Sequence, residues 1–136
     1  MITMNVFDVI SDRNVGRSAS IAVRSGAEVI TYGALLAQAG ELARTLQQSG
    51  LKPGMGLGIV DRNSPEFVIA MLAGLKCGAV VMPIASNLTQ PEQHEATEEA
   101  QLHAVLREDA HGPIRIGDRS YSLDLIQRER SSVAVH

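Results

Sequence analysis

The stretch from Phe67 to Ile84, FVIAMLAGLKCGAVVMPI, contains eighteen residues and a single charge, Lys76. A segment this apolar either crosses a membrane or is buried in a protein core. A transmembrane helix needs roughly 20 apolar residues, and a central lysine costs it about 2.5 to 3.5 kcal/mol. Gly78 and Pro83 would also interrupt such a helix. We therefore expect buried secondary structure and no membrane span.

The residues before this stretch mark the start of a helix. Ser64 offers a hydroxyl cap, Pro65 suits the first helical position, and Glu66 places an acid in the first turn. The helix is expected to run to Lys76, with an apolar stripe formed by Phe67, Val68, Met71, Leu72 and Leu75.

Two short apolar runs flank this helix. Gly56–Val60 reads as a buried strand before it, and Ala79–Met82 reads as a second buried strand after it, ended by Pro83. Such a unit has the length of a right-handed crossover between parallel strands.

The rest of the chain continues the alternation of helices and strands. The patterns predict a short helix at Asn5–Arg13, a β-hairpin over 21–30, a helix over 31–50 capped by Thr31 and ended by Gly50, a helix at Pro91–Gln101, strands at 103–107 and 113–117, and a strand end followed by a helix at 120–130. The predicted fold class is α/β, a layered αβα subdomain with a mostly parallel sheet.

Composition excludes several classes of protein. The net charge is −3 and the basic residues are scattered, so a nucleic-acid partner is not expected. Cys77 is the only cysteine, which leaves no disulfide framework, and we interpret it as a small buried residue. The first residues show neither a basic leader nor a long apolar core, so we expect a cytoplasmic location.

Four features could carry chemistry. Asp61 to Ser64 follow a predicted strand, at the edge where open α/β sheets bind ligands, but a helix cap with solvated charges is the favoured interpretation. The glycines of GMGLG, 54–58, lie between a helix and a strand, which favours a turn over a phosphate-binding loop. The third feature is a set of acids at helical spacing, which we interpret as a solvated helix face: Glu92, Glu95, Glu98 and Glu99. The fourth is the set of histidines, none of which is expected to bind a metal: His94, His103, His111 and His136.

The order of these signals resembles the opening third of adenylate-forming enzymes, which include acyl- and aryl-CoA synthetases, peptide-synthetase adenylation domains and luciferases. TYGALLAQAGELARTL is similar to the family's T-Y-x-E-L helix, and GLKPGMGLGIV to its G-x-x-x-G-D-x-V-A-I turn and strand. NSPEFVIAMLAGLKCGAVVMPI resembles its N-S-x-E-F helix and A-G-A-x-x-x-P strand, and SNLTQPE the loop that follows. The likeness spans about residues 5 to 127.

The resemblance implies a ligase that uses Mg-ATP to convert a carboxylic acid into an acyl-adenylate and then passes the acyl group to a thiol such as CoA. The full-length enzyme is therefore expected to be an acyl-CoA synthetase, with a role such as fatty acid metabolism. Its expected cofactors are ATP, Mg and CoA, and none of them is expected to bind this chain tightly. The family's T-G-x-P-K-G phosphate loop, its Y-G-x-T-E segment, its ribose-binding Asp motif and its C-terminal lysine are absent from the 136 residues. No catalytic residue is assigned.

Departures from the family pattern affect the expected sites. Met55 replaces the usual Asp of the turn, and Ala34 replaces the helix Glu that would complete a capping box. Some CoA-forming members place an Arg in the loop after the Pro, where it can reach CoA phosphates. Asn87 occupies that loop here, and it is the one cofactor-binding residue predicted.

We therefore expect residues 1–130 to form the N-terminal subdomain of an AMP-dependent ligase and 131–136 to be a tail toward a phosphate-loop subdomain. Its expected partners are the remainder of the ligase and a carboxylic acid substrate, with self-association through apolar surface that the remainder would otherwise cover. A naturally short chain, a non-catalytic binding or scaffolding module, and a small Rossmann-like nucleotide binder are the alternatives.

Overall fold

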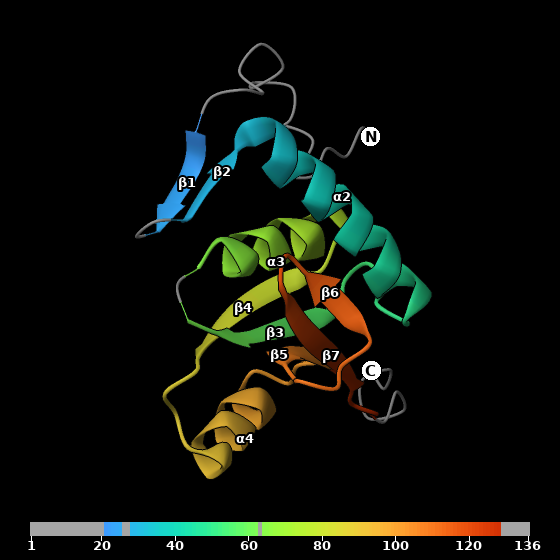
Figure 1. Cartoon of the computed structure of the whole chain (residues 1–136). Coiled ribbons are helices and arrows are strands. Elements are labelled where there is room, and N and C mark those ends of the chain that lie inside the picture. Colours follow the sequence, from blue (N-terminus) through green and yellow to red (C-terminus); the bar gives the residue numbers. More distant parts are fainter. Residues whose placement is uncertain (1–20, 26–27, 63, 129–136) are drawn as a thin grey trace.

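The computed structural model in Figure 1 describes residues 21–25, 28–62 and 64–128, with side chains from residue 31 onward. Strands β1 (Ile21–Ser25) and β2 (Glu28–Thr31) pair antiparallel, which confirms the predicted hairpin. They form a two-stranded sheet of their own. The helix predicted at Asn5–Arg13 and the tail predicted at 131–136 lie outside the described residues.

Three helices begin at side-chain caps. They are α2 (Tyr32–Gln48), α3 (Pro65–Lys76) and α4 (Gln90–Glu99). Thr31 Oγ1 accepts the N–H of Ala34 at 3.2 Å, and Ser64 Oγ accepts the N–H of Phe67 at 3.2 Å, as the sequence predicts for both caps. The bounds of α3 are those expected, and α4 begins and ends slightly earlier than predicted.

The main sheet has five strands in the order β4-β3-β5-β7-β6. These are β3 (Gly56–Asp61), β4 (Val80–Ala85), β5 (Ala104–Glu108), β6 (Ile114–Ile116) and β7 (Arg119–Leu125). Strands β4, β3 and β5 run parallel, whereas β7 pairs antiparallel with both β5 and β6. The α/β fold class is confirmed. The sheet, expected to be mostly parallel, is mixed: the pairings of β3 with β4 and β5 are parallel, and those of β7 with β5 and β6 are antiparallel.

Helices cover both faces of this sheet. In Figure 1, α2 and α3 lie on one side of it and α4 lies on the other. The larger core lies between α2, α3 and the sheet, and its side chains include Leu46, Leu57, Ile59, Leu106 and Tyr121. A smaller core under α4 contains Val60, Ile84, Leu102 and Val105. All six residues of β3 are buried because β3 lies between two strands and two helical layers.

The buried face of α3 differs from the stripe expected from periodicity. Ile69, Ala70 and Ala73 are almost fully buried, whereas Phe67 and Met71 are only partly so. The reason is that α3 packs against α2 as well as against the sheet, so small residues are buried on the side where the two helices approach. Cys77 is buried as predicted, and its Sγ donates to the carbonyl of Ala43 at 3.3 Å.

Two predicted ends are wrong. β4 does not stop at Pro83 but continues to Ala85, because β4 is an edge strand and pairs only with β3. The segment predicted as a strand end and helix forms the strand β7 to Leu125, and 126–128 are neither helix nor strand. Pairing with β5 and β6 decided the conformation of this segment over its local pattern.

Candidate functional site at the carboxyl edge of the sheet

Three parallel strands end at the same edge of the sheet. Asp61 is the last residue of β3, Ala85 the last of β4 and Glu108 the last of β5. Open α/β sheets bind ligands at this edge. Two pockets of ≈ 220 Å³ and ≈ 420 Å³ lie there, and Asp61, Arg62 and Ser86 line both. Residues 61–64 were predicted at this edge from the sequence. Of these, Asn63 lies outside the described residues.

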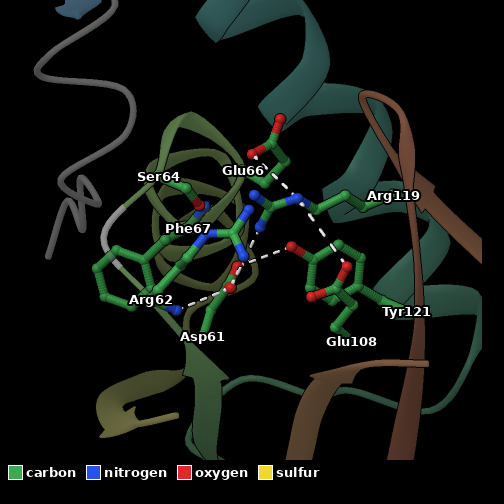
Figure 2. A network of polar contacts seen from close by, with 8 residues as sticks. All are labelled: Asp61, Arg62, Ser64, Glu66, Phe67, Glu108, Arg119 and Tyr121. Atoms are coloured by element: carbon green, nitrogen blue, oxygen red, sulfur yellow. Dashed lines mark hydrogen bonds and ion pairs between the residues drawn. The ribbon is translucent and has the colours of Figure 1, made fainter. Parts of the chain in front are cut away.

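Asp61 is the centre of a polar network that connects distant parts of the chain (Figure 2). Only 8% of the residue is exposed. The hydroxyl of Tyr121 donates to its Oδ2 at 2.7 Å, and the backbone N–H of Arg62 donates to its Oδ1 at 2.8 Å. Arg119 Nη1 reaches the same Oδ1 at 3.5 Å. Both carboxylate oxygens are therefore engaged inside the protein.

Arg119 joins this network to two more carboxylates. Its Nε lies 3.8 Å from Glu66 Oε1, in the first turn of α3, and 4.0 Å from Glu108 Oε2. These separations are longer than charge-assisted hydrogen bonds, whereas the bond from Tyr121 to Asp61 is short. The Tyr121 hydroxyl thus makes the shortest hydrogen bond to Asp61. The Arg119 guanidinium, on β7, balances the negative charges of Asp61 on β3 and Glu66 on α3.

The burial of this network shifts its acid–base properties. Desolvation raises the pKa of the Asp61 carboxyl above its ordinary 3.8, against the lowering effect of the Tyr121 hydroxyl and the Arg119 charge. Desolvation and the neighbouring Asp61 raise the pKa of Tyr121, so its hydroxyl stays protonated and keeps donating. With both oxygens occupied, Asp61 anchors the β3–α3 junction and holds the backbone of Arg62 beside the pockets.

The smaller pocket is lined mainly by polar side chains from β3, β5 and α4. Arg107 Nη1 donates to Gln93 Oε1 at 3.4 Å, and Gln93 Nε2 donates to the carbonyl of Leu88 at 3.0 Å. Arg107 Nε also lies 3.4 Å from Asp124 Oδ2. Gln93 is buried, so these bonds hold its amide in one orientation beside Gln90.

The larger pocket combines an apolar wall with polar groups. Phe67, Pro83 and Ile84 form the wall, while Arg62, Ser86 and Asn87 supply the polar groups. Asn87 lies in the loop between β4 and α4 and is exposed. The structure thus places the predicted cofactor-binding residue at the rim of a pocket, and its role stays a prediction.

The glycines of GMGLG serve a turn and close packing. Gly54 has φ 86° in the turn before β3. A Cβ on Gly58 would lie 2.7 Å from Leu102 Cδ1 and 2.8 Å from Ile84 Cδ1. Gly56 donates its N–H to His103 Nδ1 at 3.0 Å, so that imidazole is part of the scaffold. These contacts agree with the interpretation of the segment as a turn followed by a strand.

The acidic residues of α4 face solvent. Glu92 closes a capping box with Thr89, and Glu95, Glu98 and Glu99 are exposed. Across residues 31–62 and 64–128, no three His, Cys, Asp or Glu side chains are grouped so that they could hold a metal ion. None of the described helices is both long and apolar enough to span a membrane.

Sequence reasoning missed Tyr121 and Arg119. Tyr121 is 60 residues from Asp61 and Arg119 is 58 residues from it. The one signal in the sequence was that Tyr121 is an aromatic residue in a segment of alternating polar and apolar residues, which favours its burial. This pattern does not indicate which carboxylate its hydroxyl contacts. The pairing of β7 with β5 brings them together.

Fold and site together define an open α/β domain with pockets at the carboxyl edge of its parallel strands, the edge at which sheets of this class bind ligands. Comparison with known proteins gives the family. A family model described as AMP-binding enzyme matches residues 10–131, so this chain belongs to the AMP-binding enzyme family.

Relatives and solved structures agree with this family. The chain is 34% identical over 105 residues to tyrocidine synthase 3 of Brevibacillus parabrevis, covering 76% of this chain and 2% of that protein. It is 33% identical over 93 residues to 2-succinylbenzoate--CoA ligase of Escherichia coli (strain K12), covering 68% of this chain and 21% of that protein. The solved N-terminal subdomain of NpsA from Klebsiella oxytoca matches with a TM-score of 0.73 at 29% identity, covering 81% of this chain and 29% of that chain. The chain thus spans less than a third of each of these relatives.

Proposed function

We propose that this chain is the N-terminal portion of an AMP-forming carboxylic acid ligase. Such an enzyme joins a carboxylic acid to AMP, releases pyrophosphate and transfers the acyl group to a thiol. The observation that carries the proposal is the family match over residues 10–131. It is supported by the likeness to the N-terminal subdomain of NpsA and to an NpsA fusion described as an adenylation–PCP di-domain. The relatives include both peptide synthetases and CoA ligases, so the thiol belongs either to CoA or to a carrier-bound arm.

ATP and Mg belong to the longer enzyme in this proposal. The 136 residues contain no T-G-x-P-K-G loop, and the described side chains form no metal-binding group. Residues of this chain contribute instead at the carboxyl edge of the sheet. The larger pocket offers an amide, a hydroxyl and a cation beside an apolar wall, which fits an amide-containing thiol arm. We assign Asn87 to contact that arm.

The test is carboxylate-dependent exchange between ATP and pyrophosphate. The purified 136-residue chain is expected to show none, whereas the product of a reading frame that continues into a T-G-x-P-K-G loop is expected to show it. Appreciable exchange by the 136-residue chain, or a stop codon directly after His136, would contradict the proposal.

Asn87 is tested in that longer product. Asn87→Ala should raise the KM for the thiol acceptor and leave the exchange reaction unchanged, because exchange precedes the thiol step. Asn87→Arg should favour CoA over a carrier-bound thiol, since an arginine can reach CoA phosphates. An equal loss in exchange and in thioester formation would contradict the assignment.

A further inference from the structure

The charges at the C-terminal end of helix α4 are unfavourable for a helix. Glu98 and Glu99 are its last two residues, and its last turn has no basic residue. The C-terminus of a helix carries a partial negative charge, which disfavours acids there. Of the ten residues of α4, only Gln93 and Thr97 are buried. Apolar packing of the helix itself therefore contributes little to its stability.

The backbone at this end is costly as well. The N–H of Leu102 donates to the Thr97 carbonyl at 3.1 Å and the N–H of Gln101 donates to the Glu98 carbonyl at 3.1 Å, which is a Schellman motif. Its left-handed position is filled by Gln101, with φ 51°, where glycine is the favoured residue. Helices α2 and α3 have Gly50 and Gly78 at the same position.

Arg128 supplies from outside the helix what α4 lacks. Its Nε donates to the Leu102 carbonyl at 2.9 Å and its Nη2 donates to the Thr97 carbonyl at 3.4 Å. Its Nη1 and Nη2 also reach the two carboxylate oxygens of Glu98 at 3.2 Å and 3.3 Å. One planar guanidinium thus binds a carbonyl in the last turn of the helix, the carbonyl of Leu102 just after that turn, and the carboxylate of Glu98. This forked geometry suits arginine and not lysine.

We propose that Arg128 is the positioning residue of α4, the cationic C-terminal cap that holds this helix on the sheet. The opposite end of α4 carries Gln90 and Gln93, which line the smaller pocket. Arg128 therefore connects the end of the described chain to the geometry of that pocket. The inference does not depend on the proposed ligase activity.

The test is hydrogen exchange of the purified protein with Arg128→Ala. Amides of residues 97–102 should exchange about tenfold faster, because a charge-assisted contact is lost, while amides of β3 and β5 keep their wild-type rates. Arg44→Ala is the matched control, since Arg44 is an exposed arginine on α2. Unchanged exchange at 97–102, or a uniform increase across the chain, overturns the proposal.

Two further variants separate the cap from a simple ion pair. Glu98→Gln removes the charge pair but leaves both carbonyl contacts, so its exchange at 97–102 should stay near wild type; an effect as large as that of Arg128→Ala overturns the capping role. Arg128→Lys keeps the charge without the fork and should be intermediate, which tests the proposal even if the alanine variant does not fold. Full wild-type protection in the lysine variant would overturn it.

The effect on the pocket has its own signature. The side-chain amide of Gln93, which donates to Leu88, should shift in the NMR spectrum of Arg128→Ala and not in that of Arg44→Ala. An unshifted Gln93 signal together with faster exchange at 97–102 would overturn the positioning role.

Discussion

The Tyr121 hydroxyl holds one oxygen of the buried carboxylate at the end of β3, and the backbone N–H of Arg62 holds the other. Tyr121→Phe would remove the 2.7 Å bond to Asp61 and leave the carboxylate buried. A buried charged acceptor that loses its partner costs about 1–3 kcal/mol. We expect the free energy of unfolding in urea to fall by about that amount near neutral pH.

The variant Asp61→Asn provides the control for this prediction. An amide at this position carries no charge that must be desolvated, so losing the Tyr121 hydroxyl should cost less in the Asp61→Asn background. If Tyr121→Phe costs the same with and without the carboxylate, the hydroxyl and the carboxylate are not coupled.

The raised pKa of Asp61 predicts a pH dependence of stability. Because burial raises the pKa, the folded state holds this proton more tightly than the unfolded state. Protonated Asp61 therefore adds to the free energy of unfolding. This contribution is complete when the pH is below 3.8, the ordinary pKa of the group, and is lost as the pH rises through the raised pKa of the folded state. Asp61→Asn removes this titration, so the stability of the wild type relative to the variant should fall as the pH rises through that window.

Urea unfolding at several pH values measures this difference. The pKa values of Glu92 and Glu98 are lowered by their hydrogen-bond partners, Thr89 and Arg128, so their contributions are lost only as the pH falls. Both glutamates are present in wild type and variant, and their effects cancel in the comparison. A relative stability that is constant, or rises with pH, would contradict the raised pKa.

At the scale of elements, the three helix ends share one backbone motif with different residues. Gln101 has φ 51° where α2 and α3 have glycine, and a left-handed conformation costs a non-glycine residue about 1–2 kcal/mol. Gln101→Gly should therefore raise the midpoint of thermal unfolding. Gln38→Gly, in the interior of helix α2, is the control and should lower it, because glycine weakens a helix interior by about 1 kcal/mol. A lower midpoint for Gln101→Gly would contradict the account of this helix end.

The edge strand β4 shows how an element can tolerate proline. Val80 donates its N–H to the carbonyl of Met55, toward β3. Because N–H directions alternate along a strand, the nitrogen of Met82 also faces β3, whereas that of Pro83 points away from it. The missing N–H of Pro83 therefore removes a donor only from the open edge, where it hinders the addition of another strand.

At the scale of the whole molecule, apolar surface remains exposed. Among the described side chains, Val80 is 66% exposed and Leu125 is 51% exposed. Such surface favours association, so we expect the purified chain to self-associate at high concentration in light scattering, and Val80→Ser to reduce this. A monomer at all concentrations would contradict the expectation. A matched Ser86→Ala variant, at an exposed polar position, should leave the association unchanged.

Much of the element plan could be predicted because its signals are local. The caps Thr31 and Ser64, the glycine after each of α2 and α3, and the apolar run of β3 each depend on neighbours within a few residues. The polar edge at Asp61 was located for the same reason. The antiparallel strand β7 was not predicted as such, because its conformation depends on pairing with β5 and β6.

The sequence by itself determined where α2, α3 and β3 lie and, through its resemblance, which family the chain belongs to, because caps, periodicity and family motifs are properties of consecutive residues. Only the tertiary structure decided that Tyr121 meets Asp61 and that Arg128 caps α4, since strand order and packing bring together residues far apart in the chain. The stretch from Phe67 to Ile84 shows both: its helix start was readable from Ser64 and Pro65, but its buried face was decided by the approach of α2.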